Sequence, residues 1–164
     1  DQPRSRGLGD VYKRQNLITM RAWNPKLWVR FAQDATGNQR IFVGFTSING
    51  SDPTGDDPLN AASGFMVHVI NGEGTWRIAK NDGSGATVRI NTAATDDTNI
   101  HTAYLFADDA NSRWGWSLDG SAVTYETVDI PASTTLLTVV LHYETSSTVD
   151  KKIRIFGARL NQDI

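Results

Sequence analysis

The chain has 164 residues, enough for one domain with its own hydrophobic core. Its 16 basic and 18 acidic residues give a net charge of -2, which argues against a nucleic-acid partner because phosphate backbones attract basic surfaces. It contains no cysteine, which excludes disulfide frameworks, thiolate zinc sites and thiol catalysis. The apolar runs are far shorter than the ~20 residues that cross a bilayer, so no membrane partner is expected.

The first fifteen residues are predicted to lie outside the fold. They are charged and lack the apolar segment of a secretory signal peptide. The stretch GLGDVYKRQ also resembles a string found at the ends of unrelated sequences assembled from metagenomic libraries, where it reads as translated adaptor. We therefore expect residues 1–15 to be non-native and residues 16–164 to form a single β-sandwich domain.

From residue 26 onward, apolar residues recur with a period of two, which predicts half-buried strands. The turn DATGNQ is expected to join strands 27–31 and 41–45 as a hairpin. A second hairpin is expected from strands 65–70 and 76–78. Further strands are predicted at residues 88–90, 100–106, 114–118, 122–124, 135–143 and 152–160.

Three details of these strands carry further expectations. Asp119-Gly120 is a strong signal for a two-residue hairpin turn. Residues 135–143 are apolar on both faces, so this strand should be central in its sheet. In the last strand, Ile153 and Ile155 should point inward and Arg154 outward.

The longest irregular segment is predicted at residues 47–63, where SDPTGDDP cannot form a central strand. Loops of this kind often carry function. About ten strands without a useful helical period predict an all-β fold, a sandwich of two antiparallel sheets. A closed barrel is the alternative, since strand number alone does not separate the two.

Residues 95–123, TDDTNIHTAYLFADDANSRWGWSLDGSAV, resemble a hairpin of concanavalin-like and laminin-G-like jelly rolls. The matching features are Asp97, His101, Trp114 with Trp116, and Asp119-Gly120. Residues 64–92 and 130–160 fit the same pattern. The combination resembles modules of bacteriophage and other viral structural proteins, such as capsid decoration, head-fibre and tail-fibre parts. The resemblance implies a jelly-roll topology and a place on the surface of a virion.

Catalytic motifs are missing from the sequence. Concanavalin-like glycoside hydrolases carry a Glu-x-Asp-x-Glu strand, and none occurs here. Glu126 and Asp129 are three residues apart and would point to opposite faces of a strand. Gly-x-Ser-x-Gly, His-Glu-x-x-His and phosphate-binding glycine motifs are also absent. We therefore expect no enzymatic activity, no catalytic residue and no cofactor.

Metal sites are not strongly indicated either. His68, His101 and His142 lie on three predicted strands and are better explained as partly buried strand residues than as ligands. Acidic pairs in the turns could supply oxygen ligands to calcium, although turns use aspartate for its own backbone hydrogen bonds. Asp96 and Asp97 are the weak calcium candidates.

Five tryptophans are the other chemically informative residues, because exposed flat rings bind sugars or partner proteins. Trp114 and Trp116 share a face with Leu118, which favours the core over a carbohydrate platform. Trp28 alternates with apolar neighbours and is the preferred interface residue. The remaining interface or ligand candidates are Trp76, Asp52, Asp56 and Asp57.

Three functions follow from these patterns. The resemblance implies a virion structural module, forming a homo-oligomer and contacting other virion proteins or copies of itself. The alternative is a lectin-like carbohydrate-binding module that holds a surface glycan with loop aspartates and an exposed tryptophan. A glycan-cleaving enzyme would need a pair of facing carboxylates that the sequence does not offer.

Overall fold

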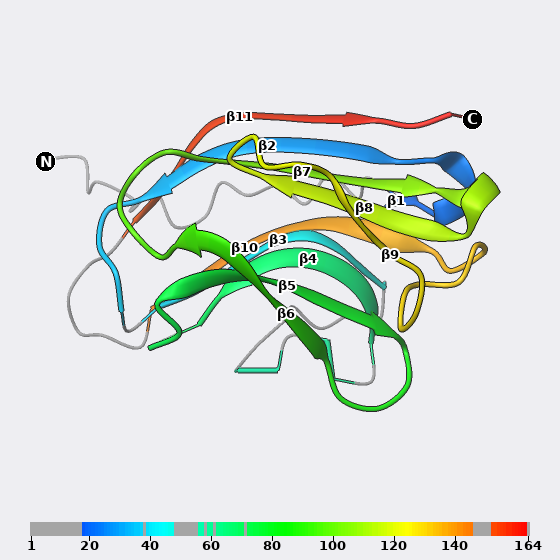
Figure 1. Ribbon diagram of the computed structural model, residues 1–164, viewed down its shortest axis with the longest axis horizontal. Coiled ribbons are helices and arrows are strands. Elements are labelled where there is room, and N and C mark those ends of the chain that lie inside the picture. The colour runs from blue at the N-terminus through cyan, green and yellow to red at the C-terminus, as the bar shows by residue number, and fades with distance from the viewer. Residues whose placement is uncertain are drawn as a thin grey trace, which may run out of the picture.

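The computed structural model describes residues 18–37, 39–47, 56–57, 59–60, 62–70, 72–145 and 152–163. Two antiparallel sheets of six and five strands pack face to face (Figure 1), so the predicted all-β sandwich is confirmed. The two helical turns are η2 (Arg21–Trp23) and η3 (Asp109–Asn111). No helix among the described residues has the length and apolar character needed to cross a membrane.

Both sheets combine strands that are distant in the sequence. The six-stranded sheet contains, in spatial order, β1 (Ile18–Thr19), β10 (Leu137–Thr145), β3 (Gln39–Ser47), β4 (Ser63–Val69), β5 (Thr75–Asp82) and β6 (Val88–Thr95). The five-stranded sheet contains β11 (Ile153–Asn161), β2 (Lys26–Gln33), β7 (His101–Asp108), β8 (Arg113–Leu118) and β9 (Thr124–Glu126).

The predicted hairpin between residues 27–31 and 41–45 is wrong, because the chain crosses between the sheets at this turn. Strand β2 pairs with β11 and β7, whereas β3 pairs with β10 and β4. Gln39, at the start of β3, stabilises this connection. Its side-chain amide donates to the side chain of Gln33 at the end of β2 and to the carbonyl of Ala35 in the turn. The apolar residues of the two strands therefore meet across the core. Alternation predicts which face of a strand is buried, but not which strand lies beside it.

The other two predicted hairpins are confirmed. Strands β4 and β5 pair in antiparallel register, and so do β8 and β9. Asp119 and Gly120 form the β8–β9 turn with φ angles of 54° and 75°. Both values lie in the left-handed region that glycine and aspartate tolerate, and the amide of Ser121 closes the turn on the carbonyl of Leu118 at 3.0 Å. Pairing with β9 begins only at Thr124, so the connection is longer than the predicted two-residue hairpin turn.

The prediction that residues 135–143 form a central strand is wrong. Beyond β3, strand β10 has only the two-residue β1 as a neighbour in the described part of the chain. A different reason explains why β10 is apolar on both faces. Val139 and Leu141 pack against the core between the sheets, whereas Val140 packs against a second cluster on the outer face. Two hydrophobic clusters, one on each side of the sheet, explain a strand that is apolar on both faces.

The main core lies between the sheets and is rich in aromatic side chains. Trp114 is fully buried, with ring centroids 5.3 Å from Phe65 and 5.1 Å from Phe45. Trp116 is also buried, which confirms the prediction that this pair belongs to the core. Trp76 is fully buried too, against the edge of Phe31, so its selection as an interface or ligand residue is wrong.

One buried ion pair crosses the core. Lys80 on β5 is 3% exposed, and its ammonium group donates to the carboxylate of Glu126 on β9 at 2.9 Å. The same group donates to the carbonyl of Val128, also at 2.9 Å. A lysine buried in this way is stable only while both acceptors remain in place.

Replacing Lys80 with Met should lower the free energy of unfolding by about 3 kcal/mol, because the Glu126 carboxylate loses its buried counter-charge. The double variant Lys80→Met/Glu126→Leu should recover most of that loss, since no charge then remains to be desolvated. Urea unfolding of the wild type, both single variants and the double variant measures the coupling. Additive losses in the double variant would contradict this account.

Candidate functional site

Four aromatic side chains lie next to one another on the outer face of the five-stranded sheet. Strand alternation turns Leu27 and Val29 into the core and leaves Trp28 outside. Trp28 lies opposite Tyr104, and Phe106 and Tyr125 both lie opposite Gly115. We call Trp28, Tyr104, Phe106 and Tyr125 the aromatic surface.

Two glycines allow rings of the aromatic surface to lie against the sheet. A Cβ atom at Gly115 would come within 2.3 Å of the Phe106 ring, and one at Gly157 within 3.1 Å of the Trp28 ring. Each ring therefore occupies the space that a side chain would fill. Trp28 remains 38% exposed and Tyr125 42% exposed, so part of each ring is open to a ligand.

Contacts link three of the four rings, those of Tyr104, Phe106 and Tyr125. The Tyr104 and Phe106 centroids are 5.0 Å apart with the planes at 27°, and Tyr125 meets Phe106 edge-on at 5.8 Å. The guanidinium carbon of Arg113 lies 3.7 Å from the centre of the Tyr125 ring. Such ring-to-ring and cation–π contacts reduce the side-chain freedom that a bound ligand would otherwise have to restrict.

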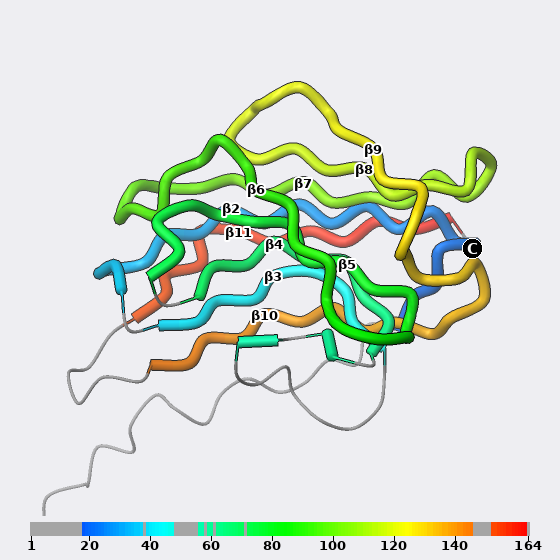
Figure 2. Tube along the Cα trace, turned by 60° about the horizontal axis from the view of Figure 1, so that its bottom comes forward, coloured from blue at the N-terminus to red at the C-terminus, as the bar shows by residue number. Residues whose placement is uncertain are grey.

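A cavity of about 310 Å³ opens beside Phe106 at one end of the aromatic surface. Strands β2 and β7, the turn η3 and the segment after β11 contribute to its lining, and Figure 2 shows the C-terminal end of the chain beside η2. The amide of Asp163 donates to the carbonyl of Trp23 at 2.7 Å, which fixes this arrangement. The residues that line the cavity are Asn24, Lys26, Phe106, Ala107, Asp108, Ala110 and Asp163.

Asp108 connects the cavity with the aromatic surface. Its carboxylate accepts hydrogen bonds from Asn111 at 2.9 Å and from the Arg113 Nε at 2.8 Å. These bonds, that from Asn111 first, hold the pKa of Asp108 below its ordinary value. The group therefore remains an ionised acceptor in neutral and mildly acidic solution.

Asp56 and Asp57, two of the predicted loop aspartates, lie beside the six-stranded sheet and do not meet Trp28. Asp56 forms an ion pair with Arg40 on β3 at 2.7 Å, and Asp57 accepts a hydrogen bond from the hydroxyl of Thr87. Both carboxylates thus bind the protein itself. Asp52, the third loop candidate, falls outside the described residues.

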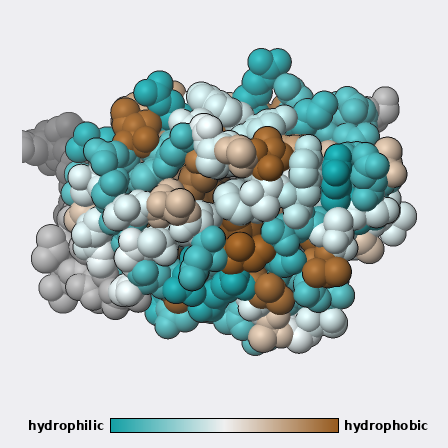
Figure 3. Space-filling view, in the orientation of Figure 1, coloured by the Kyte–Doolittle hydropathy of each residue, from teal (hydrophilic) through white to brown (hydrophobic). Residues whose placement is uncertain are grey.

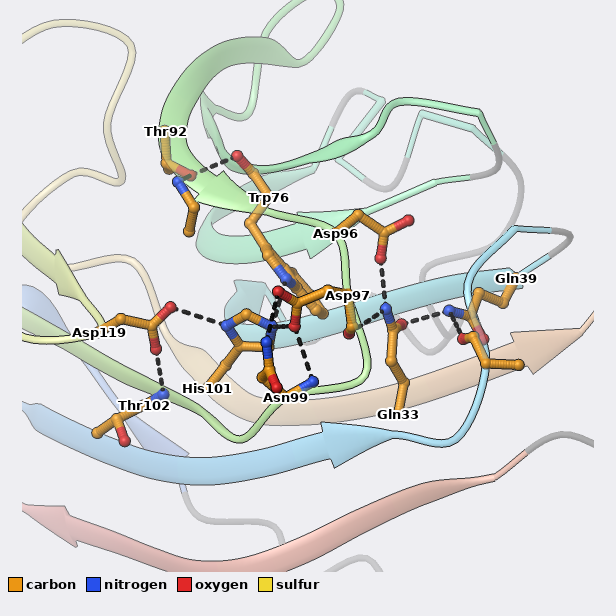
Figure 4. Close-up of polar contacts among 12 residues, drawn as sticks. Gln33, Gln39, Trp76, Thr92, Asp96, Asp97, Asn99, His101, Thr102 and Asp119 are labelled. Atoms are coloured by element: carbon orange, nitrogen blue, oxygen red, sulfur yellow. Dashed lines mark hydrogen bonds and ion pairs between the residues drawn. The ribbon is translucent and has the colours of Figure 1, made fainter.

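Asp96 and Asp97 belong to a polar network at one end of the sandwich (Figure 4). Asp97 caps the turn at Asn99, and Asp96 accepts from the side-chain amide of Gln33. His101 contacts Asp119 at 2.8 Å through Nδ1 and accepts from the indole of Trp76 at 3.1 Å through Nε2. This network joins the two sheets. The described residues include no group of three histidine or acidic side chains placed to hold a metal ion.

The outer face of the six-stranded sheet carries both a hydrophobic cluster and polar side chains. Its strands bow, with the hollow side facing away from the other sheet (Figure 1). Leu59 packs there against Met66 in the second hydrophobic cluster. Beside this cluster lie His68, Arg77 and Arg89, none of which was chosen from the sequence as a ligand-binding residue. In the sequence, each of these residues occupies an outward position of its own strand. That the three strands are neighbours, and bring the residues together, is known only from the pairing of β4, β5 and β6.

Hydrophobic residues do not merge into one broad surface on the side of the molecule seen in Figure 3. They form separate patches among polar side chains. This side therefore lacks the large apolar face typical of an obligate interface.

No protein-family model matches the sequence, and no curated protein matches it. Solved structures do match. An alginate lyase from Pseudomonas aeruginosa has a TM-score of 0.62 at 11% identity, over 88% of this chain and 67% of its own. The potassium-bound carbohydrate recognition domain of Emp46p gives 0.64 at 10% identity, over 87% of this chain and 73% of its own. A Bacillus licheniformis β-glucanase gives 0.57 at 11% identity, over 86% and 66%.

These similarities establish the fold, a concanavalin-like jelly-roll sandwich, as the sequence resemblance predicted. They contradict the prediction that the chain is not an enzyme. That prediction depended on absent motifs, but alginate lyases and a glucanase share this sandwich, so the fold serves catalysts as well as binding domains. Glu126, considered and set aside as a catalytic carboxylate, is the partner of the buried Lys80.

The stability of the protein should fall as the pH drops below about 6.5, because of His68. Burial first, and then the charges of Arg89 and Arg77, lower the pKa of His68 to about 3. Between these two values the unfolded chain binds a proton that the folded chain does not, so acid favours unfolding. At pH 5 the cost relative to neutral pH should be about 2 kcal/mol.

Urea unfolding between pH 7.5 and pH 4.5 measures this dependence, with His68→Leu as the comparison. The variant should show a flatter profile, since it has no imidazole to protonate. Parallel profiles for the two proteins would show that His68 does not titrate in this way.

Proposed function

We propose that this chain binds a polysaccharide across the aromatic surface, with sugar hydroxyl groups entering the adjacent cavity. One observation carries the proposal. The exposed rings of Trp28 and Tyr125 share a face with Phe106, and Phe106 lines a cavity together with Asp108 and Lys26.

A sugar-binding site needs both a flat aromatic ring and hydrogen-bonding groups. The C–H face of a pyranose ring packs against a flat aromatic ring, while its hydroxyl groups require donors and acceptors at fixed positions. Asp108 supplies acceptors, and Lys26 supplies a donor. The Asn24 side-chain oxygen already accepts from the amide of Asp109, so its NH2 group is a further donor. A cavity of about 310 Å³ is at the lower end of the range for small-ligand sites, which suits one sugar unit of a longer chain.

The comparisons support a carbohydrate ligand. The similar structures include a carbohydrate recognition domain, alginate lyases and a β-glucanase. At 10–11% identity these names support the class of ligand, and the aromatic surface is the argument from this chain itself.

The virion structural role remains a prediction from the sequence resemblance alone, and no comparison reported above points to a phage or virus. In that case Trp28 would contact another copy of the chain or a second virion protein, because exposed aromatic rings also suit protein interfaces. The charged lining of the cavity beside Phe106 favours the sugar.

Replacing Trp28 with Ala should weaken polysaccharide binding at least tenfold, about 1.4 kcal/mol, because the largest exposed ring is removed. Affinity electrophoresis in gels containing alginate or mixed-linkage β-glucan measures the effect. The matched control is Val128→Ala, which removes an apolar side chain that is 63% exposed and not part of the aromatic surface. Binding by the control should equal that of the wild type.

Two outcomes would overturn the proposal. One is a wild-type chain that binds neither polysaccharide nor any member of a glycan array. The other is full binding by Trp28→Ala together with a change from oligomer to monomer on light scattering, which would assign Trp28 to a protein interface.

A further inference from the structure

The sheet register brings three rings and an arginine into one row on the outer face of the six-stranded sheet. His142 on β10 lies opposite Phe42 on β3, which lies opposite His68 on β4. His68 in turn lies opposite Arg77 on β5. Arg89 on β6 lies one step away, opposite Ala79, the residue two places after Arg77. This row is on the other side of the sandwich from the aromatic surface.

His68 is completely buried, yet it makes no hydrogen bond to any described residue. Both ring nitrogens are without a partner among the described residues, and the ring stacks on Phe42 at 6.2 Å. Glu73 is the nearest acid, but its carboxylate is 3.9 Å from Nδ1, which is beyond hydrogen-bond distance. A neutral imidazole carries one N–H donor, and buried donors in folded proteins nearly always have an acceptor.

Arg77 and Arg89 also carry unused donors. Their Nε atoms are buried without a partner in the described part of the chain, although each side chain is about a quarter exposed. The two guanidinium groups share one carboxylate oxygen of Glu73, at 3.0 Å and 4.0 Å. The two guanidinium groups therefore share one carboxylate, and Arg89 also donates to the backbone carbonyl of Asp56. The remaining exposed quarter of each arginine side chain faces solvent.

The charge balance at this place favours an anion. The charges of Arg77 and Arg89 oppose protonation of His68, so the local potential is positive. Glu73 is one carboxylate shared between two guanidinium groups, so it neutralises only part of this potential. A ligand with a negative charge and several oxygen acceptors would satisfy both the potential and the unused N–H groups.

From these contacts we infer that Arg77, Arg89 and His68 form a second binding site, which takes a carboxylate or sulfate group. The two guanidinium groups would hold the oxygens of the anion and the imidazole N–H would donate to one of them. The inference is independent of the polysaccharide site, because the two places lie on different sheets and share no residue.

The experiment follows the histidine side chains of the full chain, labelled with ¹⁵N, during titration with sodium glucuronate. Sodium sulfate, a trimer of galacturonate and neutral glucose are the other probes. The His68 signals are identified by their loss in His68→Leu. Glucuronate and sulfate should shift these signals in a saturable way, whereas glucose should not. Tighter binding of the trimer would assign the anion to an acidic glycan, and equal binding would indicate a small free anion.

Arg77→Gln should weaken glucuronate binding at least tenfold, and Arg77→Lys should retain part of the affinity through its charge. Arg154→Gln removes an exposed positive charge on β11 and serves as the matched control, with unchanged binding. Trp28→Ala should also leave the titration unchanged. The inference is overturned if His68 does not respond to either anion, or if Arg77→Gln and wild type respond alike while both remain folded by thermal unfolding.

Discussion

The packing of Trp114 between Phe45 and Phe65 is the interaction on which the two-layer architecture depends. The indole reaches from the five-stranded sheet to two strands of the six-stranded sheet, with centroid distances of 5.1 and 5.3 Å. Large rings fill this core in the described part of the chain, and protein interiors are packed about as densely as organic crystals. The candidate sites lie on the outward residues of the strands and in the segments that join them.

The two outer faces differ in chemistry. The five-stranded sheet presents rings supported by glycine, next to a cavity with fixed charges. The six-stranded sheet presents arginine and histidine beside a small hydrophobic cluster of its own, partly covered by Leu59. Stacking suits the flat face of a sugar, and guanidinium groups suit an anionic substituent. A ligand with both features could be recognised at two places on one molecule.

Much of the fold could be predicted from local patterns, because alternation reports burial residue by residue. Val29 and Ile41 face the core as expected, and Asp119-Gly120 forms its turn. The identity of neighbouring strands could not be predicted, because pairing depends on contacts far apart in the sequence. For the same reason Trp28 was recognised alone, whereas Tyr104 and Tyr125 join it only through the register of β2, β7, β8 and β9. Trp76 was misjudged because one strand's alternation does not reveal that the end of the sandwich is closed by His101.

The glycines beneath Phe106 and Trp28 have a consequence for how this surface can change over evolutionary time. Position 115 can gain a side chain only if the ring at position 106 is lost or turned away, since even a methyl group would overlap it. A side chain at position 157 would also crowd the Trp28 ring, but less closely, because its Cβ atom would be 3.1 Å from the ring. Each glycine and its ring should therefore change together, so relatives of this chain that keep one member of a pair are expected to keep the other.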